Sequence, residues 1–170
     1  MKINFKLCLF LLGVCSVTAV ADEKIPTDAE RVAGIQKECA EAGEAIKQRQ
    51  AEKALYDRLG KRPKIKNLVT ELLAAHSKNE KIGHLFVHVK KGPFVKNVTD
   101  FLVAGTGGKA NYRGKDMLAV HKHMKVSNAD FLAAGGDFEA VMKKAKYGPN
   151  EIQEVICSLA SFIPVVVVQQ

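Results

Sequence analysis

The 170-residue sequence contains no tryptophan, and aromatic residues make up only 6% of it. It also lacks the Cys-x-x-Cys-His motif that attaches haem covalently in c-type cytochromes. We find no pair of carboxylates at catalytic spacing, no nucleophile with an adjacent base and no glycine-rich phosphate-binding loop. The sequence therefore identifies no dedicated catalytic residue, and we look instead for a binding function.

Long apolar runs are also scarce, and the first of them lies close to the start of the chain. Lys2 and Lys6 form a basic start, the apolar run covers Leu7–Val17, and small residues lead up to Ala21. This order is typical of a cleavable export signal. We therefore predict a signal peptide over residues 1–21, and a protein that is periplasmic or secreted after cleavage near Ala21. The run is shorter than the roughly 20 residues that cross a bilayer, so we expect no membrane span in the mature form; a membrane anchor is the alternative.

Acidic residues are outnumbered, with 18 Asp and Glu against 26 Lys and Arg and a net charge of +8. Loss of residues 1–21 removes two lysines and no acidic residue, which leaves +6. A basic excess can indicate a nucleic-acid partner. Here the lysines are scattered and no nucleic-acid motif accompanies them. We interpret them as a solvated surface and predict no nucleic-acid partner.

Only two cysteines follow the predicted signal, Cys39 and Cys157. Disulfides persist in oxidising compartments, so a bridge between them is possible, but the sequence leaves this open. Cys157 lies in the apolar stretch 152–159, where it more readily serves as a small buried hydrophobe.

Residues 22–52 are rich in Ala, Glu, Lys and Gln and contain no aromatic residue. The stretch Thr27–Glu30 fits a capping box at the start of a helix. Apolar residues then recur every three or four positions, at Val32, Ile35, Cys39, Ala42 and Ile46. We predict a helical extension that packs on the following domain. A short coiled-coil seam is the alternative, and the choice between monomer and dimer stays open.

Residues 53–164 have helical rather than strand periodicity, and we predict an all-α domain. One helix is expected over 65–76, with His76 exposed at its end, and another from Gly92–Pro93 to the glycines at 105–108. Ser127–Asp130 fits a capped start of the next helix, and Gly148–Pro149 begins the last helix. We expect Pro164 to end that helix and residues 165–170 to form an extended tail.

Residues 54–163 resemble a group I truncated haemoglobin, a short globin with a two-over-two helical sandwich around haem. The resemblance rests on landmarks in the family's order, although the usual glycine pair of the opening segment is reduced to Gly60-Lys61. Those landmarks are Leu55–Gly60, the pair Leu85-Phe86, the glycines Gly107-Gly108, the stretch Tyr112–Gly114, the proximal-helix motif Met117, Val120 and His121, and a final helix over 151–159.

The resemblance implies non-covalent haem b with His121 as the proximal iron ligand. Arg113 and Lys115 are candidate partners for the haem propionates. The walls of the haem pocket are expected from eleven positions that include the ligand, each of which could otherwise be ordinary core: Leu73, Phe86, Phe94, Val98, Phe101, Met117, Val120, His121, Val126, Phe131 and Ile156.

The resemblance also places apolar residues where the family commonly has polar ones, at Leu73, Phe94 and Val98. We therefore expect reversible binding of O2, NO or CO, fast oxygen release and weak discrimination among gases. Any NO dioxygenase or peroxidase-like side activity would come from the iron. Alternatively, His88, or less readily His84, Lys90 or Lys91, is a sixth ligand and the protein transfers electrons to a redox partner or senses redox state. A haemless exported interaction protein is the third alternative.

Overall fold

A computed structural model describes residues 24–168, so the predicted export signal at 1–21 lies outside the described residues. Within 24–168 the chain forms helices and no strand. The helices are α1 Asp28–Glu41, α2 Gly43–Glu52, α3 Leu55–Arg58, α4 Lys61–Lys78, the 3₁₀ helix η1 Gly83–Phe86, α5 Lys91–Gly105, α6 Met117–His121, α7 Asn128–Lys144, α8 Pro149–Ala160 and α9 Ile163–Val166.

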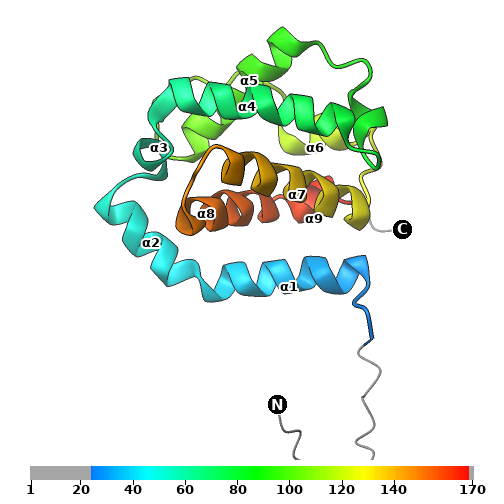
Figure 1. Cartoon of the computed structure of the whole chain (residues 1–170), viewed down its shortest axis with the longest axis horizontal. Coiled ribbons are helices and arrows are strands. Elements are labelled where there is room, and N and C mark those ends of the chain that lie inside the picture. The colour runs from blue at the N-terminus through cyan, green and yellow to red at the C-terminus, as the bar shows by residue number, and fades with distance from the viewer. Residues whose placement is uncertain (1–23, 169–170) are drawn as a thin grey trace, which may run out of the picture.

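The helices are arranged as one pair over another (Figure 1), with α4 and α5 above α7 and α8. Helix α4 packs on both α5 and α7, and α7 packs on α8. Helix α1 runs beneath the lower pair and contacts α7 and α8. This confirms the predicted all-α, two-over-two architecture. No helix among residues 24–168 is long and apolar enough to cross a membrane.

Helix α4 supplies much of the core because its apolar residues recur every three or four positions and so share one face. Ile65, Leu68, Val69, Leu72 and Leu73 are all buried, as their spacing predicted. Buried residues of α5, α7 and α8 complete the same cluster. The periodicity thus fixes which side of α4 faces α5 and α7.

The capping box predicted at Thr27 and the capped helix start predicted at Ser127 are both present. Thr27 caps α1 by accepting from the Glu30 amide, and the Glu30 carboxylate accepts from the Thr27 amide in return. Ser127 and Asp130 make the same reciprocal bonds at the start of α7. These caps satisfy amide groups that the first turn of a helix leaves without partners.

The extension consists of two helices, and it packs on the domain as predicted. Val32 is buried in a cluster with Ala160 and Ile163. Cys39 of α1 forms a disulfide with Cys157 of α8, across a Cα–Cα distance of 5.3 Å. The interpretation of Cys157 as a buried hydrophobe is therefore wrong, because the packing of α1 on α8 brings the two cysteines within bridging distance.

A buried carboxylate, Glu154 of α8, forms a second link between the extension and the domain. Its side chain is 2% exposed. Its two oxygens accept from Arg49 Nε at 2.6 Å, from Gln50 Nε2 at 2.9 Å and from Arg58 Nη2 at 2.5 Å. The charge is thus paired and hydrogen-bonded, which a buried carboxylate requires.

The glycine pair after α5 has a steric reason. Gly107 adopts φ +95°, a region that favours glycine. A Cβ on Gly108 would lie 2.6 Å from the ring of Tyr56. The Tyr56 amide also donates to the Thr106 carbonyl at 2.8 Å. The pair therefore lets the end of α5 meet the start of α3 closely.

Two local expectations are wrong. His76 is only 4% exposed, because it continues the buried stripe of α4 by one more turn. Residues 163–166 form the helical turn α9 with Pro164 in its first turn, where proline is tolerated, instead of an extended tail. Val166 is buried, and the Val168 amide donates to the Val126 carbonyl at 2.9 Å.

Candidate functional site

The side chain of His121, the last residue of α6, is positioned by a backbone hydrogen bond. Asp116 begins this short helix by accepting from the Ala119 amide at 2.7 Å. One turn later, His121 Nδ1 lies 2.8 Å from the Met117 carbonyl oxygen. A carbonyl can only accept, so Nδ1 carries the hydrogen, and in the neutral ring Nε2 has a free lone pair. Histidines that bind metals commonly have this arrangement, in which the second ring nitrogen is fixed by a backbone carbonyl.

His121 offers one protein donor rather than a set of donors. Among residues 24–168 no group of three or more His, Cys, Asp or Glu side chains is placed to hold a metal ion. A metal ion bound by protein alone usually takes three or four such ligands. A single half-buried imidazole with a free Nε2 would instead suit an iron whose remaining ligands come from a macrocycle.

The predicted pocket walls are mostly half-buried. Of the eleven predicted positions only two are buried, Leu73 and Val126. Phenylalanine is usually buried in a folded core, as Phe138 is here. The half-buried state leaves apolar surface that a flat hydrophobic ligand can cover. The half-buried members are Phe86, Phe94, Val98, Phe101, Met117, Val120, His121, Phe131 and Ile156.

Aromatic contacts join several of these walls. The rings of Phe86 in η1 and Phe94 in α5 meet edge to face, with centroids 6.1 Å apart. Phe101 contacts Tyr112 at 5.6 Å and Phe162 at 5.5 Å. Phe162 was not among the predicted wall residues, although it lies three positions after Leu159 and so extends the apolar stripe of α8.

The structure brings four of the eleven predicted wall residues into one cluster. Phe94, Val98, Phe101 and Ile156 pack against the main core. Phe131 instead belongs to the second cluster, with the extension and the end of α8. Contact between haem and Phe131 therefore stays a prediction, as does contact with Met117, Val120 and Val126 near the imidazole.

The three positions predicted to face the bound gas all carry apolar side chains. Leu73 comes from the inner face of α4, and Phe94 and Val98 lie one turn apart on α5. Leu73 is buried, and Phe94 and Val98 pack against the main core. None of these side chains carries a hydrogen-bond donor.

The other candidate ligands and propionate partners lie on the surface. His84, His88, Arg113 and Lys115 are all exposed. Their roles toward haem stay predictions. The Lys115 backbone carbonyl does accept from the Tyr112 hydroxyl at 2.6 Å, which orders the loop before α6.

The buried histidine His76 packs against Phe86, one of the predicted wall residues. The His76 ring lies 4.9 Å from the ring of Phe86. Its Nδ1 is 2.8 Å from Asp137, whose other oxygen accepts from Asn79 at 2.9 Å. Burial lowers the pKa of His76, and the nearby Asp137 carboxylate only partly opposes this shift. The spacing of His76 after Leu72 and Leu73 was the signal that sequence analysis overlooked.

Comparison with known proteins agrees with the all-α, two-over-two fold. The bacterial-like globin family model matches residues 54–165. A group 1 truncated haemoglobin from Tetrahymena pyriformis is 30% identical over 90 residues, which are 53% of this chain and 74% of that protein.

Solved structures give the same result. The ferric crystal structure of the Tetrahymena pyriformis truncated haemoglobin superposes with a TM-score of 0.66 at 25% identity, covering 69% of this chain and 100% of that one. The 2/2 haemoglobin of Synechococcus sp. PCC 7002 shares the fold, with a TM-score of 0.61 at 18% identity over 66% and 94% of the two chains. The chain therefore belongs to the bacterial-like globin family, as a truncated globin of group I.

Proposed function

We propose that this globin holds haem b non-covalently through Nε2 of His121 and reversibly binds a diatomic gas. The observation that carries the proposal is the hydrogen bond from His121 Nδ1 to the Met117 carbonyl, which leaves Nε2 free. Haem, when bound, supplies an iron with a coordination position for O2, NO or CO. The half-buried phenylalanines supply apolar walls of the kind that a porphyrin covers.

The side chains predicted to face the bound gas give it no hydrogen bond. Leu73, Phe94 and Val98 offer no hydrogen bond on the distal side. A bond from a protein donor to a polar ligand is worth about 0.5–1.5 kcal/mol, or more when charge is involved. We therefore expect rapid oxygen release and little preference for O2 over CO.

We place this activity outside the cytoplasm. The Cys39–Cys157 disulfide supports export, because such bonds are rare in the reducing cytosol. N-terminal sequencing of the protein from a periplasmic or secreted fraction tests the placement. A mature chain that begins near residue 22 supports it, and protein found in the cytoplasmic fraction instead contradicts it.

The proposed iron ligand is tested with His121→Gly in haem-loaded protein. We expect the variant to lose the ferrous–CO Soret band of the native protein, and added imidazole to restore it by filling the space that the side chain vacated. His123→Ala is the matched control, because His123 is exposed two residues away. An unchanged spectrum in His121→Gly would contradict the proposal.

The apolar distal side is tested with Val98→Gln and the control Val98→Leu. An added amide donor is expected to slow oxygen dissociation about ten-fold, which corresponds to about 1.4 kcal/mol, whereas leucine leaves the rate nearly unchanged.

We also expect a high-spin ferric spectrum that His88→Ala does not alter. A low-spin spectrum that His88→Ala converts to high spin would instead favour the six-coordinate, electron-transfer alternative.

A further inference from the structure

A groove runs between α4 and α5, along the side of α4 that carries Arg62, Lys66 and Thr70. Its volume is about 510 Å³, which lies in the range of small-ligand sites. Side chains of both helices line it, and four of these carry positive charge: Arg62 and Lys66 from α4, and Lys91 and Lys96 from α5. We call it the α4–α5 groove.

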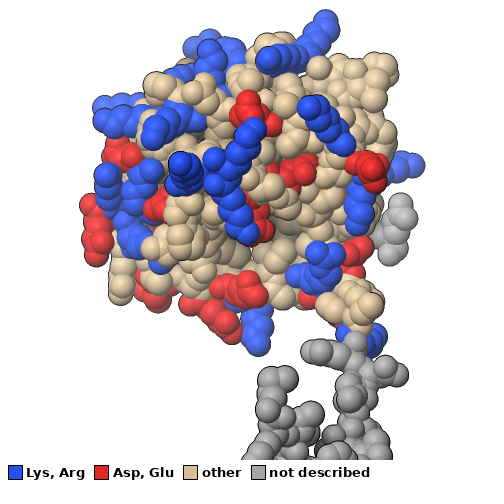
Figure 2. All heavy atoms as spheres, viewed as in Figure 1, with Lys and Arg blue, Asp and Glu red and all other residues tan. Residues whose placement is uncertain are grey.

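The charges of the groove are only partly neutralised. Asp100 accepts from Arg62 and from Lys96, whose Nζ lies 3.0 Å away. The Lys96 bond first, and then Arg62, lower the pKa of Asp100, so this carboxylate stays ionised. Lys66 and Lys91 make no ion pair within residues 24–168. The groove therefore keeps an excess of positive charge, and Lys and Arg also gather over α4 and α5 on the molecular surface (Figure 2).

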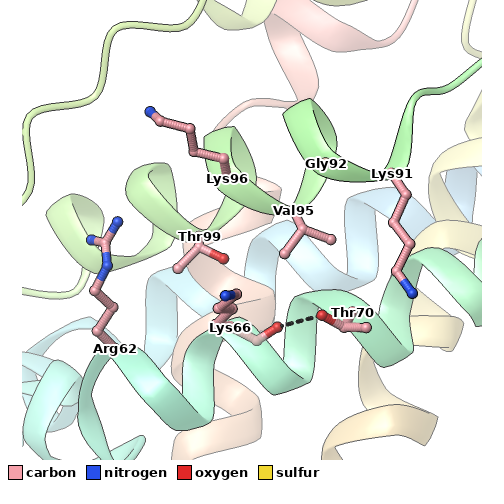
Figure 3. A pocket seen from close by; sticks show the side chains of 8 residues that line it. All are labelled: Arg62, Lys66, Thr70, Lys91, Gly92, Val95, Lys96 and Thr99. Carbon is pink, nitrogen blue, oxygen red and sulfur yellow. Dashed lines mark hydrogen bonds between the residues drawn. The ribbon is translucent and has the colours of Figure 1, made fainter.

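Figure 3 shows how these side chains lie. Lys66 rises from α4 toward α5, and Lys91 extends from α5 toward α4, so that the two ammonium groups approach the groove from opposite sides. Lys96 points away from α4. Two unpaired ammonium groups on opposite sides of a groove suit a ligand with several negative oxygens.

The floor of the groove holds a polar atom without a partner. Thr99 is 2% exposed, and its hydroxyl is the buried side-chain group that makes no hydrogen bond among the described residues. Its oxygen is directed into the space between the helices, above Lys66 (Figure 3). A buried hydroxyl without a partner is unfavourable, so this atom indicates a missing acceptor.

The N-terminus of α5 opens into the same groove. Lys90 is the N-cap residue of this 15-residue helix and its side chain makes no capping bond. Gly92, in the first turn, lines the groove. The first turn of a helix carries free amides and a partial positive charge, which favour anions.

We propose that the α4–α5 groove binds a phosphoryl group of a small ligand, with Lys66 and Lys91 as charged donors and the Thr99 hydroxyl as a neutral one. The site is separate from the proposed haem pocket. Val98 faces the main core one residue before Thr99, so the two sites use different faces of α5.

The proposal is tested by titrating the ferrous–CO, ¹⁵N-labelled holoprotein with sodium pyrophosphate at low ionic strength. We expect saturable amide shifts at Lys91, Gly92 and Thr99. Lys66→Ala/Lys91→Ala is expected to weaken binding at least ten-fold. Thr99→Val is expected to weaken it about five-fold, as the loss of one neutral hydrogen bond does, while leaving the protein at least as stable, since it removes an unsatisfied group.

The matched control is Lys78→Ala/Lys109→Ala, which removes the same charge from exposed lysines elsewhere. Equal weakening in both double variants, or shifts that do not saturate, would show diffuse surface charge and overturn the proposal.

Vesicles of phosphatidylcholine with and without phosphatidic acid distinguish a lipid headgroup from a free ligand. Vesicle binding that pyrophosphate competes away assigns the phosphoryl group to lipid, and pyrophosphate binding alone assigns it to a free ligand. Binding of neither probe overturns the proposal.

Discussion

The disulfide between Cys39 and Cys157 is expected to contribute a large share of the stability of this globin. It closes a loop with a sequence separation of 118. The chain-entropy relation gives about 5 kcal/mol for a loop of this length. Total unfolding free energies of single domains are about 5–15 kcal/mol. Cys39→Ser/Cys157→Ser should therefore unfold at a much lower urea concentration than the native protein.

The measurement is urea unfolding of haem-loaded protein, followed by circular dichroism. Either single serine variant removes the same cross-link as the double variant. The two single losses and the double loss should therefore agree within about 1 kcal/mol, instead of adding as they would for independent sites. Additive losses would refute the reasoning. So would a double variant within about 1 kcal/mol of the native protein, because α1 would then be held by its packing alone.

Four further variants test other parts of the fold. Glu154→Gln removes the buried anion that the half-buried Arg49 and Arg58 share, leaving Arg58 only Glu151, and should cost about 1–3 kcal/mol in urea unfolding; a loss below about 1 kcal/mol would contradict the network. Burial lowers the pKa of His76 in the folded protein, so as the pH falls the unfolded chain takes up a proton at this residue before the folded chain does. The free energy of unfolding should therefore be unaffected above the ordinary histidine pKa and should decrease as the pH drops below it, less steeply in His76→Gln. Gly108→Ala should cost about 1–3 kcal/mol through the clash with Tyr56, whereas Gly135→Ala, which has open space around it in mid-helix, should gain up to about 1 kcal/mol.

The helices could be predicted from the sequence because their signals are local. The spacing of Ile65, Leu68 and Leu72 determines the buried face of α4, and the Ser127 capping box determines where α7 begins. The resemblance of the segment around His121 to a proximal helix added the position of the site. The structure then supplied the Nδ1 bond that orients the imidazole.

The features that the sequence did not predict depend on contacts between distant segments. Nothing near Cys157 indicates that α1 lies against it, so the disulfide was left open. His76 was expected at the surface because its partner Asp137 lies 61 positions away. The prediction that Pro164 ends a helix is wrong because proline occurs both after the end of a helix and in the first turn of a new one, and the sequence alone does not distinguish the two.

The carboxylate of Glu154 has a consequence for where this protein can be divided. A family-length piece beginning at residue 53 would keep the globin helices but lose Arg49 and Gln50, two of the three side chains that solvate that charge inside the protein. Half of its neutralisation therefore comes from a segment outside the matched globin region. A shortened version would lose these two partners together with the Cys39–Cys157 disulfide, so its expected instability would come from the missing extension rather than from a defect in the pocket.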